Sequence, residues 1–122
     1  MMDFLEKKIS AYVYLFYDDS DNFDKKTKNL DYYRILSKKL TPAVLDFISY
    51  LENNNDPTEE EIQFNSYEIA KKYLNKDEIR MFFSVLYILS LKQKEGPRFA
   101  SMVKFMGVDR FLSSLKENLY SN

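Results

Sequence analysis

Apolar residues recur along this chain with the spacing of amphipathic helices. Met2, Leu5, Ile9 and Phe16 fall at i, i+3, i+4 and i+7 positions, which predicts a helix over 3–17. Similar stripes predict further helices over about 30–39, 42–52, 58–74, 76–94, 98–106 and 109–119. The pattern therefore predicts an all-α fold of six or seven helices.

Capping residues set the expected helix boundaries. Thr41 and Pro42 resemble an N-cap followed by a first-turn proline, which predicts a helix start there. Thr58 and Glu61 have the spacing of a capping box. The pattern leaves open whether 58–74 is one helix, or a short turn followed by a helix that Ser66 caps. Gly107 is expected to end one helix, and Asp109 to cap the next.

The segment from Lys76 to Lys94 is apolar in nearly every direction around its axis. A helix of this kind is usually buried, so we expect it at the centre of a single compact bundle. The polar run 18–29 is expected to be a flexible loop. The whole chain, 1–122, is predicted to be one domain, because 122 residues with 45% hydrophobic content suffice for one core.

Composition removes most kinds of catalytic site. The chain has no cysteine and no histidine, which excludes thiolate nucleophiles, Ser-His and Cys-His pairs, and imidazole metal ligands. The acidic loop from Asp18 to Asp24 fails the calcium-loop pattern, because neither register places Gly at position 6 and Glu at position 12. We therefore expect no enzyme, no cofactor and no bound metal.

The chain shows no targeting signal or membrane span. Its N-terminus lacks a basic region followed by an apolar one, and its longest apolar stretch, 81–91, is too short to cross a bilayer. A cytoplasmic protein without membrane contact is expected. The abundance of Lys, Asn, Tyr, Phe and Ile also indicates a genome of low GC content.

Charge is distributed unequally along the chain. Residues 1–65 carry a balance of −5 and residues 66–122 a balance of +4, within a total of −1. A basic half of this kind can contact phosphates, and the candidate contacts are Lys92, Lys94, Arg98, Lys104 and Arg110. Residues 98–119 also resemble a helix-turn-helix around Gly107, although the second helix is out of register by about one residue.

Tyrosine supplies a second candidate surface. Among ten tyrosines, Tyr14 and Tyr32 lie off the apolar stripes and are expected to be exposed, as partner-binding residues. The leading hypothesis is a non-enzymatic interaction or adaptor module that binds a protein partner or forms a homo-oligomer. The alternative is a nucleic-acid-binding accessory protein that uses residues 66–122.

Overall fold

A computed structural model describes residues 4–11, 30–54, 56–93 and 96–120. After a helix over 4–11, the elements are α3 (Leu30–Glu52), α4 (Glu59–Tyr73), α5 (Lys76–Leu91), α6 (Phe99–Met106) and α7 (Val108–Tyr120). Within these ranges there is no strand, so the all-α prediction is confirmed. The predicted loop at 18–29, and the end of the predicted helix 3–17, lie outside the described residues.

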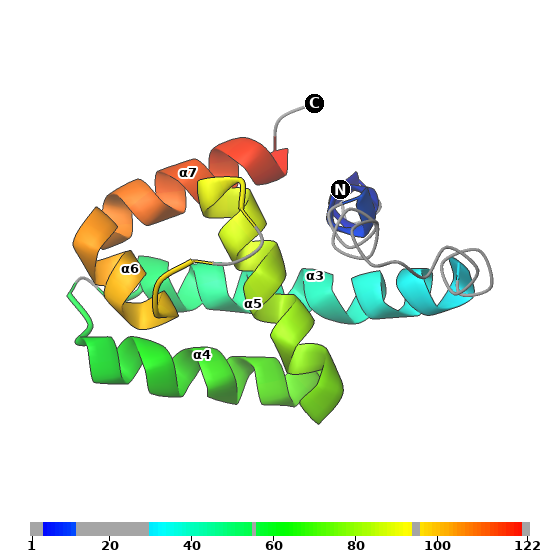
Figure 1. Cartoon of the computed structure of the whole chain (residues 1–122), viewed down its shortest axis with the longest axis horizontal. Coiled ribbons are helices and arrows are strands. Elements are labelled where there is room, and N and C mark those ends of the chain that lie inside the picture. The colour runs from blue at the N-terminus through cyan, green and yellow to red at the C-terminus, as the bar shows by residue number, and fades with distance from the viewer. Residues whose placement is uncertain (1–3, 12–29, 55, 94–95, 121–122) are drawn as a thin grey trace.

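The helices pack around α3 and α5 (Figure 1). The chain runs along α3, turns back along α4, and then crosses α3 as α5. Helix α5 contacts α3, α4 and α7, and most of its residues are buried. The prediction of a central apolar helix is therefore confirmed, although α5 ends at Leu91, and Lys92 follows in the left-handed conformation with φ 58°.

The predicted boundary at Thr41 and Pro42 is wrong. Helix α3 continues from Leu30 to Glu52 with Pro42 inside it. A proline in a helix interior costs about 3 kcal/mol, but apolar residues continue the same buried stripe on both sides of it. Each contributes about 1.5–3 kcal/mol on burial, so packing outweighs the proline. These stripe residues are Leu36, Leu40, Val44, Phe47 and Leu51.

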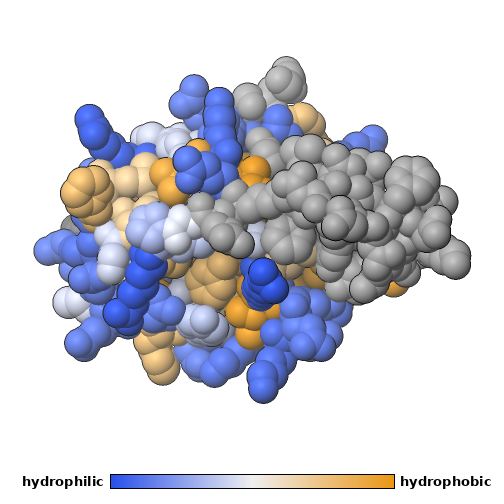
Figure 2. Space-filling view, viewed as in Figure 1, coloured by the Kyte–Doolittle hydropathy of each residue, from blue (hydrophilic) through white to orange (hydrophobic). Residues whose placement is uncertain are grey.

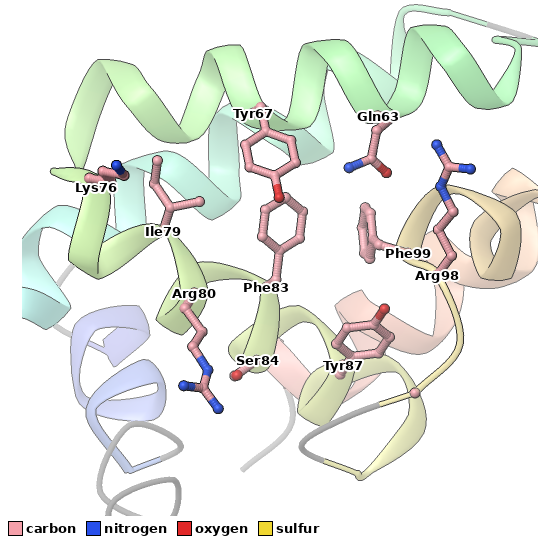
Figure 3. A pocket seen from close by; sticks show the side chains of 11 residues that line it. Gln63, Tyr67, Lys76, Ile79, Arg80, Phe83, Ser84, Tyr87, Arg98 and Phe99 are labelled. Carbon is pink, nitrogen blue, oxygen red and sulfur yellow. The ribbon is translucent and has the colours of Figure 1, made fainter.

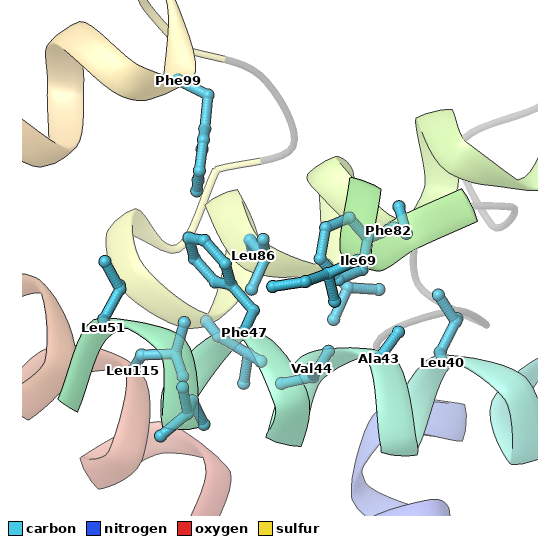
Figure 4. Packing of buried hydrophobic residues seen from close by; sticks show 14 of the residues in the cluster. Leu40, Ala43, Val44, Phe47, Leu51, Ile69, Phe82, Leu86, Phe99 and Leu115 are labelled. Carbon is cyan, nitrogen blue, oxygen red and sulfur yellow. The ribbon is translucent and has the colours of Figure 1, made fainter. Parts of the chain in front are cut away.

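One hydrophobic core includes residues from every described helix. Phe47 of α3 lies near its centre, fully buried, beside the rings of Phe82 and Phe99 (Figure 4). The ring of Phe111 also packs against it. The ring centroids of these neighbours lie 5.6–6.3 Å from that of Phe47. Aromatic pairs at such separations, tilted or edge to face, are favourable contacts. The Phe47 ring of α3 thus contacts residues of α5, α6 and α7, which are distant in sequence.

Two capping boxes position α4 and α5. The Thr58 hydroxyl accepts from the Glu61 amide, and the Glu61 carboxylate accepts from the Thr58 amide, as predicted. Residues 59–73 form one helix, which resolves the alternative that the sequence left open. Asn75 and Glu78 form a second box that starts α5. The buried Glu78 carboxylate also accepts from Lys39 at 3.0 Å, which ties α5 to α3.

No helix within the described ranges is both long enough and apolar enough to cross a membrane.

Candidate functional site

A cavity of about 600 Å³ opens between α4, α5 and the start of α6 (Figure 3). Its wall combines aromatic rings and cationic side chains with one carboxamide, one serine hydroxyl and one isoleucine. A volume of this size falls in the range of small-molecule and nucleotide-sized pockets. The cavity is therefore the starting point for a functional site.

Four aromatic rings form the apolar wall. Tyr67 comes from α4, Phe83 and Tyr87 lie one turn apart on α5, and Phe99 is the first residue of α6. The Tyr67 and Phe83 centroids are 5.0 Å apart, Phe83 and Phe99 5.2 Å, and Tyr87 and Phe99 5.9 Å. Phe99 is buried and also contacts Phe47 of the core. Phe99 is consequently held in place by the core, whereas Tyr67 is exposed at the cavity.

The segment between α5 and α6 holds Tyr87 at the cavity wall. The Tyr87 hydroxyl donates a hydrogen bond to the Pro97 carbonyl oxygen. Burial raises the pKa of this hydroxyl above its ordinary value. The backbone of Gly96 passes so close that a Cβ there would lie 3.0 Å from Tyr87 Cε1. A glycine thus permits the close approach that positions the ring.

Lys76, Arg80 and Arg98 supply the positive charge. In Figure 3 Lys76 and Arg80 lie on one side of the aromatic rings and Arg98 on the other. All three residues are exposed, and among the described residues none of them has a carboxylate within ion-pair distance. Their charge is available to an anion that enters the cavity.

Other lysines of the basic half are already paired with carboxylates. Lys71 pairs with Glu68 at 3.1 Å, Lys72 with Asp46 at 2.8 Å, Lys104 with Asp56 at 2.8 Å, and Lys116 with Glu52. Ion pairs of this kind compensate most of the local field at a surface. The net positive charge of residues 66–122 is therefore concentrated at the cations that have no carboxylate partner. The cations of the cavity wall are among them.

Gln63 projects from α4 into the space between Tyr67 and Phe99 (Figure 3). Its Oε1 atom is buried, and no donor among the described residues lies within hydrogen-bond distance. A buried acceptor without a donor costs about 1–3 kcal/mol. The carboxamide, which forms part of the cavity wall, therefore has an unused acceptor at its buried oxygen.

The wall suits the binding of a planar anionic ligand. Aromatic faces can stack against a flat heterocycle, and lysine and arginine can pair with phosphates. Within the described ranges, no group of three or more carboxylates could hold a metal ion. The wall has no carboxylate, so it offers no acid–base pair of carboxyl groups.

The structure separates the cations that the sequence proposed as phosphate contacts. Arg98 lines the cavity, whereas Lys92 follows the end of α5 and Arg110 is exposed on α7. The hydrogen bond and charge of Lys104 hold the pKa of Asp56 below its usual value, so that lysine is already engaged. Lys94 lies outside the described residues.

The predicted helix-turn-helix over 98–119 is wrong. Gly107 alone separates α6 from α7, with a φ of 92° that favours glycine. A helix-turn-helix needs a turn of three or four residues. Of the two proposed partner-binding tyrosines, Tyr14 lies outside the described residues, and Tyr32 lies in α3 with a side chain that is not described.

Neither Gln63 nor the aromatic wall was predicted from the sequence, although part of the signal was present. Lys76, Arg80, Phe83 and Tyr87 recur at i+3 or i+4 and so share one face of α5. Proteins that bind single-stranded nucleic acid use both cations and aromatic rings, although Phe83 and Tyr87 also pack against the core. Gln63 and Phe99 join that face only through tertiary packing, and periodicity cannot show this.

The chain resembles part of several lysine–tRNA ligases. It is 38% identical over 89 residues to that of Rickettsia typhi, 35% over 88 residues to that of Rickettsia prowazekii, and 33% over 86 residues to that of Borreliella burgdorferi. These matches cover 70–72% of this chain but only 16–17% of the relatives. The chain thus spans about one sixth of their length. No family model matches it, and no solved structure matches it significantly.

These relatives overturn the leading hypothesis of a protein-binding adaptor. They are named for a reaction on tRNA, and none of them is named as an adaptor. Most apolar residues of the described helices lie in the core and are not available to a protein partner. In Figure 2 the coloured part of the visible face is mainly hydrophilic, with apolar residues in small separate areas. The resemblance favours the alternative, a contact with nucleic acid.

Proposed function

We propose that this chain is a non-catalytic RNA-binding module whose partner is tRNA, and that it holds a single-stranded part of that RNA at the cavity. The observation that carries the proposal is the resemblance to lysine–tRNA ligases over about 70% of the chain. The cavity supports it, because its aromatic rings and unpaired cations are the groups that bind unpaired nucleotides.

The proposal assigns no ligase chemistry to this chain. The resemblance covers about one sixth of each relative, so most of the ligase has no counterpart in the matched region. The chain also lacks histidine and cysteine, so its chemistry would depend on carboxylates, lysine or tyrosine. Binding and positioning of RNA require none of these catalytic groups.

Double-helical RNA fits the cavity less well than a single strand. An A-form duplex keeps its base faces stacked inside the helix and presents phosphates, hydroxyls and the edges of its minor groove. The aromatic wall offers ring contacts, which only an unstacked base can use. The geometry therefore favours a loop or an unpaired end of the RNA.

The first test is the salt dependence of RNA binding. Fluorescence anisotropy with a labelled lysine-accepting tRNA transcript, between 50 and 200 mM salt, gives the slope of log K against log[salt]. Replacing Lys76, Arg80 and Arg98 together by Gln removes three phosphate contacts. The slope is expected to fall by about 2 and the affinity about tenfold or more, since each contact contributes about 0.7 to the slope.

The matched control replaces Lys71, Lys72 and Lys116 by Gln. This triple variant has the same net charge, but the three lysines already have carboxylate partners away from the cavity. Its slope and affinity are expected to stay close to those of the unaltered chain. Equal losses in both variants, no binding at low salt, or equal binding of duplex DNA of similar length would each contradict the proposal.

A further inference from the structure

Gln63 carries a hydrogen-bonding group in the cavity wall that ring stacking and phosphate pairing do not use. Its carboxamide lies between the rings of Tyr67 and Phe99 in Figure 3, and its buried Oε1 has no donor among the described residues. Stacking and phosphate pairing are nearly independent of base identity. A carboxamide at the same place offers one acceptor and two donors in a plane.

We propose that the cavity accepts one unpaired nucleobase and that Gln63 selects which base it is. This inference rests on the proposed function, because it assumes that the ligand is RNA. Every nucleobase presents an edge on which a hydrogen-bond donor lies beside an acceptor, and the four edges differ in their arrangement. A carboxamide can pair with such an edge through two hydrogen bonds, as glutamine does with adenine.

The positions of the other groups are consistent with this arrangement. The exposed ring of Tyr67 and the ring of Phe83, 5.0 Å from it, provide faces for the base. Arg98, Lys76 and Arg80 flank the rings, where the phosphates on either side of an extruded nucleotide would lie. The Gln63 oxygen is buried and has no donor among the described residues, so a rotation of the carboxamide towards the cavity would let a donor on the base satisfy it.

The test compares four homopolymeric single-stranded RNA octamers, of A, C, G and U, at constant salt. The unaltered chain is expected to bind the best octamer between about fivefold and about 150-fold more tightly than the worst. Gln63→Met keeps the length of the side chain and removes its hydrogen bonds. This variant is expected to bind all four octamers with similar affinity.

Two further variants separate selection from folding and from stacking. Gln93→Met makes the same chemical change at the chain's other glutamine, which is exposed after the end of α5, and should leave the preference unchanged. Tyr67→Ala removes a stacking face, and should weaken binding of all four octamers while preserving their order. Melting temperatures establish that each variant folds.

The outcomes distinguish this inference from the proposed function. Salt-dependent binding of all four octamers with equal affinity would overturn the role of Gln63 and leave RNA binding intact. A preference that persists unchanged in Gln63→Met would also overturn it. Absence of binding to every octamer and to tRNA would contradict the proposed function as well. Loss of preference in Gln63→Met alone, with retained binding, supports base selection.

Discussion

At the scale of single residues, the phenylalanines of this chain have opposite roles that composition does not distinguish. Phe47 is fully buried among other rings, whereas Phe105 on α6 is 94% exposed. Phe99 belongs both to the core, where it packs on Phe47, and to the wall of the cavity. The core therefore extends into the candidate site, and changes at its centre reach the cavity rings.

Replacement of Phe47 by Ala is expected to lower the free energy of unfolding by about 3–5 kcal/mol, because the variant loses buried area and leaves a void. Urea denaturation followed by circular dichroism measures the loss. Phe105→Ala removes the same ring from an exposed position, and is expected to change stability by less than about 0.5 kcal/mol. Similar losses in the two variants would contradict the assignment of Phe47 to the core.

At the scale of elements, α3 shows that tertiary packing can override a local helix-breaking signal. Thr41 and Pro42 have the chemistry of a helix start, yet the helix passes through them. The Thr41 hydroxyl donates to the Ser37 carbonyl oxygen at 2.8 Å, a bond within the preceding turn. The buried stripe on both sides of Pro42 packs against α4, α5 and α7, and this holds the two halves in one helix.

Replacement of Pro42 by Ala is expected to raise the free energy of unfolding by about 1–2 kcal/mol. Proline inside a helix costs about 3 kcal/mol relative to alanine, and the substitution removes this cost. Part of the gain is offset because alanine leaves the unfolded chain with more conformational freedom than proline does. Chemical denaturation gives the value. Pro97→Ala serves as the control, because Pro97 lies outside the helices, between α5 and α6, and its replacement removes no helix-interior cost. A destabilised Pro42→Ala would show that the proline ring contributes packing that alanine cannot replace.

At the scale of the whole molecule, ion pairs join segments that are distant in sequence. Asp56, between α3 and α4, accepts from Lys104 of α6, and Lys116 of α7 pairs with Glu52 at the end of α3. The acidic first half and the basic second half of the chain thus compensate each other within one fold. The same pairing leaves Lys76, Arg80 and Arg98 without carboxylate partners among the described residues.

The contact between Asp56 and Lys104 predicts a pH dependence of stability. The folded-state pKa of Asp56 is lowered, so its ionised carboxylate stabilises the folded state. This contribution to stability is fully present above the unfolded-state pKa of about 3.9 and is lost as pH falls through the folded-state pKa. Asp56→Asn should therefore lower the melting temperature slightly between pH 5 and 8. The difference from the unaltered chain should shrink towards zero at lower pH.

The companion variant for this pH dependence is Lys104→Gln, which removes the donor of the same contact. Its difference in melting temperature should shrink towards lower pH in the same way as that of Asp56→Asn, because a protonated Asp56 no longer pairs with Lys104. A difference for Asp56→Asn that persists at pH 2.5 would show that its effect does not come from the ionised carboxylate. The whole titration is measured by thermal denaturation in buffers of constant ionic strength.

The sequence by itself determined the local properties of this protein. Helical periodicity identified the all-α class, the buried helix α5 and most helix positions, because apolar spacing records which face is buried. The capping box of Thr58 and Glu61 could also be predicted, because the two residues are only three positions apart in sequence. The uneven charge pointed to a nucleic-acid contact as an alternative.

The tertiary structure alone decided how these pieces combine. It joined the halves of α3 across Pro42, since burial outweighs a local preference. It also determined which lysines are paired, because ion-pair partners such as Asp56 and Lys104 lie 48 positions apart. The cavity itself arises where Gln63, Phe83 and Phe99 from three helices converge. No spacing rule along one helix brings such residues together, so only packing could reveal the site.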